Sequence, residues 1–211
     1  MPQVRKAEVE RRLLDSARGE FLRHGFQGAS LRNIAEAANI SLANVYSYAK
    51  DKDDLFRRVL MTVVSDIDRV EKYFSSYAPA GNEFDSLETE TEQLKSGVCY
   101  IYAHKTEFIL LLNRSAGSTL ENYPEKIVHG YAKNCRRFLT HVKKSNSSIH
   151  FRAPSNFFFE SVARFALKTI SEMLKQNFSK KAMDDVAKEI AAYNFHGFRG
   201  MAQVTSKQVR K

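Results

Sequence analysis

Apolar residues recur at intervals of three and four along most of the chain, which is the spacing of helices that bury one face. The first such helix, at about residues 5–24, has four apolar residues on one stripe: Val9, Leu13, Ala17 and Phe21. It ends near Gly25, which suits a left-handed helix cap. Only nine glycines and four prolines interrupt the chain. The pattern therefore predicts an all-α protein.

The rest of the chain repeats this pattern in longer helices. Asp51 or Asp53 can cap a long helix with an apolar stripe that consists of Leu55, Val59, Val63, Ile67, Val70 and Phe74. Further helices are predicted at about 84–103, 106–114, 123–144, 156–177 and 181–205. The last two are separated by a short turn near Ser179, which predicts an antiparallel helical hairpin.

Residues 30–48 contain two short helices joined by a tight turn. Ser30 is a good N-cap for a helix at 31–38, whose inward positions are Leu31, Ile34, Ala35 and Ala38. After the turn, a second short helix has Ile40 and Val45 as inward anchors. A small residue at the crossing and a free outer face on the second helix are typical of a helix-turn-helix that enters the major groove of DNA.

The stretch FLRHGFQGASLRNIAEAANISLANVYSYAKDKDDLF resembles the N-terminal domain of the TetR/AcrR family of bacterial transcriptional repressors, and the likeness covers about residues 8–60. The positions that agree in register are Phe21, Gly25, Phe26, Ser30, Ile34, Ala35, Ile40, Ser41, Tyr46, Tyr48, Lys52 and Leu55. The resemblance implies a DNA-binding domain at 1–52 and a helical effector-binding and dimerisation domain at 53–211. It also implies a homodimer that represses transcription from a palindromic operator on double-stranded DNA and is released by a small-molecule effector.

Two residues depart from the family pattern. Asn39 stands where the family usually has glycine, and asparagine is the next most tolerant residue at a left-handed turn position. Ala49 stands where an aromatic residue usually pins the recognition helix. Replacing a buried Phe by Ala costs about 3–5 kcal/mol when nothing refills the space. Tyr48 and Phe56 are the candidates to refill it.

Resemblance and chemistry together assign DNA contacts to Ser30, Arg32, Leu42, Ala43, Asn44, Tyr46, Tyr48 and Lys52. Ser30 suits a phosphate, and Arg32 can reach a guanine. Leu42, Ala43 and Asn44 are expected to contact bases. The two tyrosines and Lys52 are expected to hold phosphates. Partial burial is an equal alternative for Tyr48, and a solvated lysine is the alternative for Lys52.

The resemblance carries over to the C-terminal region only as architecture. Aromatic residues that could line an effector pocket are Tyr100, Tyr102, Phe108, Tyr131, Phe138 and Phe157. Ordinary core packing is the alternative for each of them. The helical hairpin offers residues for a four-helix dimer interface, namely Phe158, Val162, Phe165, Thr169, Ile190, Tyr193 and Gly197.

The formal charge of +9 and a pI near 9.5 favour a polyanionic partner. Most of the excess lies at 126–181, with 12 Lys and Arg against 2 Asp and Glu, and solvated helix faces account for most such runs. Two cysteines 36 positions apart indicate neither a disulfide framework nor a zinc site. The chain has no signal-peptide pattern and no membrane span, so we expect a protein of the bacterial cytoplasm, at the nucleoid when bound to DNA.

Two other classes of function remain as alternatives. An enzyme could use His104, His129, His141, His150 or Cys135, but these residues lack the spacing of metal or nucleophile motifs. We therefore expect no catalytic residue, metal or cofactor. A helical adaptor for another protein is the second alternative. Neither alternative gives Arg32, Asn44, Tyr46 and Lys52 a joint purpose.

Overall fold

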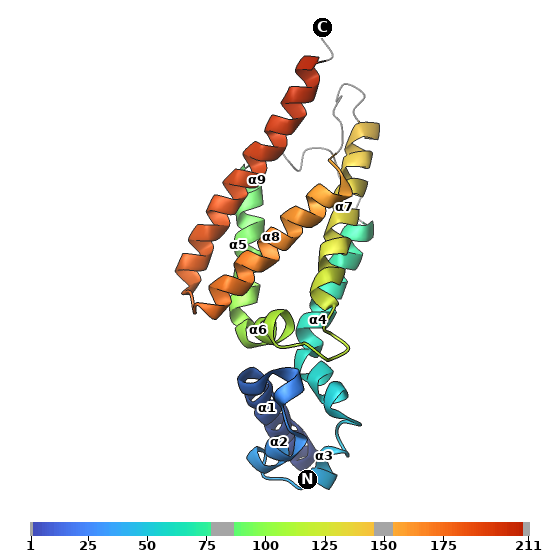
Figure 1. The fold of residues 1–211 in the computed structure, drawn as a ribbon, viewed down its shortest axis with the longest axis vertical. Helices are drawn as coiled ribbons and strands as arrows, with labels where there is room; N and C mark the ends of the chain where they lie inside the picture. Colours follow the sequence, from blue (N-terminus) through green and yellow to red (C-terminus); the bar gives the residue numbers. More distant parts are fainter. Residues whose placement is uncertain (1, 77–86, 146–153, 209–211) are drawn as a thin grey trace. The chain divides into compact units, whose positions relative to one another are not determined.

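A computed structural model describes residues 2–76, 87–145 and 154–208. Within these ranges the chain forms nine α-helices and no strand, which confirms the all-α prediction (Figure 1). The helices are α1 (Pro2–Gly28), α2 (Leu31–Ala37), α3 (Leu42–Val45), α4 (Lys52–Ser76), α5 (Leu87–Ala103), α6 (Lys105–Asn113), α7 (Tyr123–Ser145), α8 (Asn156–Lys175) and α9 (Lys180–Gln208).

The helix boundaries follow the local signals in the sequence, with two refinements. Gly25 breaks α1 with φ 68° and ψ 173°; the positive φ was expected for this glycine, but its ψ is not that of a left-handed helix cap, and helical turns resume and continue to Gly28. Asp51 rather than Asp53 caps α4, because Asp51 Oδ1 accepts a hydrogen bond from the Asp54 amide at 2.7 Å. The predicted start of a helix at 84 lies outside the described residues.

The turn between α8 and α9 is closed by Asn177, which takes a left-handed conformation with φ 57°. The Phe178 amide donates to the Met173 carbonyl at 3.0 Å, which is the long hydrogen bond of a Schellman helix end. Ser179 then caps α9 by accepting from the Ala182 amide at 3.2 Å. This geometry confirms the turn that was predicted near Ser179.

The chain divides into two compact units, and neither is continuous in sequence. The first consists of Met1–Arg69 and His104–Glu125, and the second of Val70–Ala103 and Lys126–Lys211. The expected boundary at 52/53 differs from this division, because the first half of α4 buries its apolar stripe in the first unit. The division of function between 1–52 and 53–211 stays a prediction.

Three aromatic rings form the centre of the first unit. The ring centroid of Phe21 lies 4.9 Å from that of Phe56 and 6.2 Å from that of Phe26, and the Phe26 and Phe56 centroids are 5.3 Å apart. Phe21 and Phe56 are completely buried. The rings thus join α1 to α4 on both sides of the break at Gly25.

Ala49, the residue that departs from the family pattern, is buried with an exposed fraction of 2%. The protein therefore closes around its methyl group. Of the two aromatic residues expected to fill the space, Phe56 is completely buried and Tyr48 is half-buried. That one of these rings replaces the expected aromatic anchor stays a prediction.

Helices α8 and α9 are joined by the predicted short turn but diverge from it along their described lengths, so the turn is as predicted and the side-by-side packing of an antiparallel hairpin is not (Figure 1). In the second unit, α5 runs alongside α9. The buried residues that α8 and α9 contribute to the second unit include Phe159, Ala163, Met173, Leu174, Met183, Ala187, Ala191 and Phe195. Among the described helices, none combines the length and the apolar character that crossing a membrane requires.

We expect Phe56→Ala to lower the free energy of unfolding by about 3–5 kcal/mol, because the space left by the ring lies between Phe21 and Phe26. Met61→Ala is the control, since Met61 lies on the same helix and is 62% exposed. The control should change stability by less than about 0.5 kcal/mol. Urea unfolding followed by circular dichroism measures both, and equal losses would contradict the packing described here.

Candidate nucleic-acid interface

The turn between α2 and α3 has the tight geometry of a helix-turn-helix. Asn39 adopts φ 54°, which confirms that asparagine serves at the left-handed position. The Asn39 amide donates to Glu36 O and the Ile40 amide donates to Ala35 O, both at 3.0 Å. Ala35 is only 3% exposed, so α2 and α3 can cross closely at this small residue.

Ser41 is the N-cap of helix α3, and its hydroxyl accepts a hydrogen bond from the Asn44 amide at 3.1 Å. The helix proper ends at Val45, but the Tyr48 and Ala49 amides donate to the Val45 carbonyl at 2.9 and 3.0 Å. Helical turns therefore continue to Ala49. Val45 is completely buried, and it fixes which face of this segment points outward.

The residues predicted to contact bases lie on or beside the outward face. Ala43 is exposed, whereas Leu42 and Asn44 are half-buried. Arg32 is exposed on α2, two residues after the N-cap Ser30. The structure thus brings these residues into one helix-turn-helix, while their individual roles stay predictions.

The predicted phosphate contacts differ in their surroundings. Tyr46 is 54% exposed, and its hydroxyl has no hydrogen-bond partner among the described residues. Tyr48 is half-buried, as its alternative interpretation supposes. Tyr46 is therefore the more accessible of the two tyrosines to an oxygen of another molecule.

Lys52 is bound to the protein itself. Its ammonium donates to Gln27 O and Ala29 O, both at 3.1 Å, and lies 4.8 Å from the centroid of the Phe26 ring. Carbonyls at a helix C-terminus carry partial negative charge, which attracts a cation. An ammonium has three donors, so one remains for a phosphate. Lys52 is thus neither the freely solvated lysine nor a purely DNA-facing one.

The segment between α3 and α4 is fixed by two aspartates. Asp54 Oδ2 accepts from the Lys50 amide at 3.1 Å, and the Asp54 amide donates to Asp51 at 2.7 Å. The bond from the Lys50 amide lowers the pKa of the Asp54 carboxyl, and the side chain of Arg58 adds to the effect. This turn determines how the helical segment at residues 42–49 connects to α4.

Residues after α6 also hold the helix-turn-helix, and sequence reasoning missed them. The Phe26 amide donates to Arg114 O at 2.8 Å. Thr119 donates twice to Asp53, from its amide at 2.8 Å and from its hydroxyl at 2.7 Å. Gly117 has φ 83°, and a Cβ there would lie 2.7 Å from Gln27 Cγ. These partners lie far from the motif in sequence, so no local pattern reveals them.

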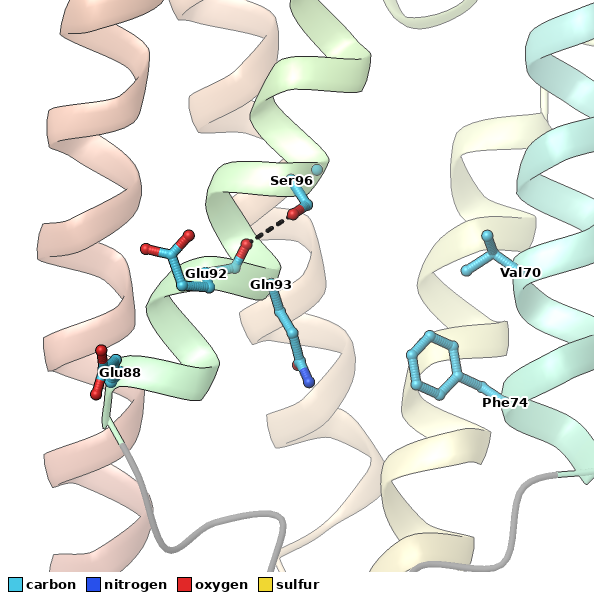
Figure 2. A pocket seen from close by; sticks show the side chains of 7 residues that line it. Val70, Phe74, Glu88, Glu92, Gln93 and Ser96 are labelled. Carbon is cyan, nitrogen blue, oxygen red and sulfur yellow. Dashed lines mark hydrogen bonds between the residues drawn. The ribbon is translucent and has the colours of Figure 1, made fainter.

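The second unit contains an open groove of about 700 Å³ between the end of α4 and the start of α5. Figure 2 shows Val70 and Phe74 of α4 facing α5 across the opening, while the side chain of Gln93 extends downward from α5 in this view. Val70 and Phe74 are 54% and 50% exposed. The remaining lining residues are Glu88, Glu92, Ser96 and Gly97. One wall is therefore apolar and the other mostly polar.

None of the six aromatic residues predicted for a pocket lines this groove. Phe108 is buried in the first unit, and Phe157 is 75% exposed. Tyr102 and Tyr131 are each 39% exposed, while Tyr100 and Phe138 are half-buried. The groove instead uses the apolar stripe of α4 where it continues beyond the core of the first unit.

The residues predicted for a dimer interface lie on α8 and α9. Phe165 and Tyr193 are 55% and 71% exposed, and Gly197 has open space around the position of a Cβ. Phe158, Val162, Thr169 and Ile190 are half-buried. Among these predicted interface residues, Phe165 and Tyr193 thus present large apolar side chains to solvent.

Two of the residues considered for an enzyme, Cys135 and His129, have surroundings that the structure describes. Burial raises the pKa of the Cys135 thiol to about 11, so it is protonated at neutral pH and a poor nucleophile. His129 pairs with Glu160 at 3.1 Å, and His150 lies outside the described residues. In the part of the chain that the structure describes, no three His, Cys, Asp or Glu residues are placed to hold a metal ion.

Known proteins share this helix-turn-helix. Residues 13–59 match the sequence model of bacterial regulatory proteins of the tetR family. The HTH-type transcriptional regulator AcrR of Shigella flexneri is 30% identical over 111 residues, which are 48% of this chain and 51% of that protein. The probable acrEF/envCD operon repressor of Escherichia coli K12 is 28% identical over 104 residues, 48% of this chain and 46% of the repressor. The matches thus span about half the length of these relatives.

Solved structures share the fold across most of the chain. NalD, the secondary repressor of the MexAB-OprM multidrug efflux pump in Pseudomonas aeruginosa, has a TM-score of 0.65 and 17% identity, covering 92% of this chain and 97% of that one. The transcriptional regulator FadR of Bacillus subtilis, solved with stearoyl-CoA, has a TM-score of 0.57 and 16% identity, covering 85% and 96%. At these identities the likeness concerns the fold alone. Residues 13–59 are therefore similar to the helix-turn-helix of bacterial regulatory proteins of the tetR family, and the fold of the chain is similar to that of NalD and FadR.

Proposed function

We propose that this protein is a transcriptional repressor that binds a two-fold symmetric operator as a homodimer and leaves it when a small-molecule effector binds. The observation that carries the proposal is the helix-turn-helix, whose α3 is anchored by buried Val45 and keeps Ala43 and Tyr46 exposed. The similarity to regulators that are named as repressors supports the same function. Such a protein acts in the bacterial cytoplasm, where its DNA is.

Two groups of residues divide the work of binding DNA in this proposal. Arg32, Leu42, Ala43 and Asn44 contact base edges and select the sequence. Ser30, Tyr46, Tyr48 and Lys52 hold phosphates and set the position of the protein on the duplex. Because Lys52 also ties α1 to α4, its replacement would weaken both the fold and DNA binding.

Dimerisation compensates for the shortness of the recognition helix α3. A helix of four residues reaches few base pairs, and a two-fold dimer doubles the contact on a palindromic site. The exposed side chains of Phe165 and Tyr193 supply apolar surface for the contact between subunits, and open space at Gly197 allows close approach.

Selection from random duplexes should return a two-fold symmetric motif. Affinity for it should fall steeply as salt rises, because bound phosphates release counterions. A variant with Phe165→Asp and Tyr193→Asp should sediment as a monomer and return only a half-site, with much weaker binding. Selection of unrelated sequences by the wild-type protein would contradict the repressor proposal.

Asn44→Ala and Tyr46→Phe should separate the two kinds of contact. We expect Asn44→Ala to lose discrimination at particular base pairs, by about 1–3 kcal/mol each. Tyr46→Phe removes only the hydroxyl, so it should weaken binding to all sequences by a similar factor. Binding measurements over a set of single-base operator variants distinguish the two patterns, and the same pattern in both variants would refute the division.

The effector site in this proposal is the groove between α4 and α5. Its apolar wall at Val70 and Phe74 suits a small molecule with an apolar body. Helix α4 extends from this wall back to Lys52 and Asp53, beside the helix-turn-helix. A ligand that shifts α4 would therefore change how the two reading helices of a dimer are spaced, and effector and operator would weaken each other reciprocally.

The chain contains no tryptophan, so Phe74→Trp would place a single fluorescent reporter in the groove. We expect effectors to change its emission over the same concentration range in which they release the operator. Met61→Trp is the control, because Met61 lies on the same helix and is 62% exposed but does not line the groove. An effector that releases DNA but changes the tryptophan emission of the control variant alone would show that the effector site is not this groove.

A further inference from the structure

A buried carboxylate reaches the start of α2 from α1. Glu20 is only 5% exposed, and its Oε1 accepts from the Ser30 amide at 3.2 Å and from the Asn33 side-chain amide at 3.1 Å. Its other oxygen, Oε2, lies 3.8 Å from Nε2 of His24, whose side chain is half-exposed. Burial of a carboxylate is unfavourable unless hydrogen bonds compensate it, so these contacts have a structural purpose.

The contacts resemble a capping box that is divided between two helices. In a capping box, the N-cap side chain bonds an amide in the first turn, and an acid or amide three residues later accepts from the N-cap amide. The first half is present, because Ser30 Oγ accepts from the Arg32 amide at 3.2 Å. The residue three positions after Ser30 is Asn33, and the acceptor of the Ser30 amide is Glu20 instead.

We propose that Glu20 and Asn33 form a split capping box, which positions α2 while it keeps negative charge away from the exposed surface at position 33. Asn33 is exposed beside Arg32, at the end of α2 that faces DNA in the proposed function. An acid at position 33 would complete the cap locally but would repel phosphates. Glu20 supplies the same hydrogen bond from the interior, and the exposed position stays neutral.

The positioning role rests on the structure of the free protein and does not depend on DNA binding. In Glu20→Met, a side chain of similar length has no acceptor for the Ser30 amide. We expect hydrogen exchange at this amide to accelerate at least about tenfold, since an exchange barrier lowered by 1.4 kcal/mol corresponds to a factor of ten. Unchanged exchange at Ser30 would overturn the cap.

Two double variants restore the cap locally and differ only in charge. Both variants carry Glu20→Met, and they differ in having Asn33→Gln or Asn33→Glu. Each places an acceptor three residues after Ser30, so each should restore slow exchange at the Ser30 amide. The Gln variant should bind DNA like the wild-type protein. The Glu variant should bind about three- to tenfold more weakly on every sequence, most clearly at low salt.

The same comparison in the wild-type background covers the case in which Glu20→Met fails to fold. Asn33→Glu should again bind DNA more weakly than Asn33→Gln, by a similar factor. Equal affinities for the Glu and Gln variants would overturn the role of charge placement. Failure of the wild-type protein to bind any duplex would refute the proposed function instead, and the exchange measurement at Ser30 would still decide the cap.

Discussion

The contact between Phe21, Phe26 and Phe56 determines the arrangement of the first unit. Gly25 turns the chain sharply after the first long stretch of α1, and the two phenylalanines on either side of this break both meet Phe56. The rings therefore fix the direction of α4 relative to α1. The helix-turn-helix lies between these two helices in sequence, so both of its ends are held by the same apolar cluster.

Hydrogen bonds around this cluster fix the position of the start of α4, which apolar packing alone does not determine. Lys52 satisfies two carbonyls at the end of α1, Asp54 closes the turn before α4, and Asp53 receives both donors of Thr119. Each of these side chains has a backbone group or a long-range residue as its partner. The start of α4 is therefore determined by hydrogen bonds as well as by packing, and this gives α3, which precedes it, a defined position.

Much of this fold could be predicted from the sequence because the signals are local. Helical spacing located the helices, Gly25 and Asn39 marked positive φ values, and Ser30 and Asp51 cap helices as their residue types suggest. The contacts of Arg114, Thr119 and Glu20 could not be predicted, because their partners lie 10 to 88 positions away and no periodic pattern connects them. The groove was missed for a related reason. Its apolar wall belongs to the same stripe as the core residues Leu55 and Val63, and only the tertiary structure determines where that stripe ceases to be covered.

The shared use of α4 has a consequence for building hybrid regulators. A fusion at the boundary suggested by the helix-turn-helix would separate Lys52 from Asp53, Leu55 and Phe56, and it would omit the segment after α6 that bonds to Phe26. A recipient protein would thus have to supply matching surfaces at both places. Transfer of DNA specificity to another regulator is therefore a matter of exchanging surface residues on α2 and α3 within one intact scaffold, rather than of joining separate modules.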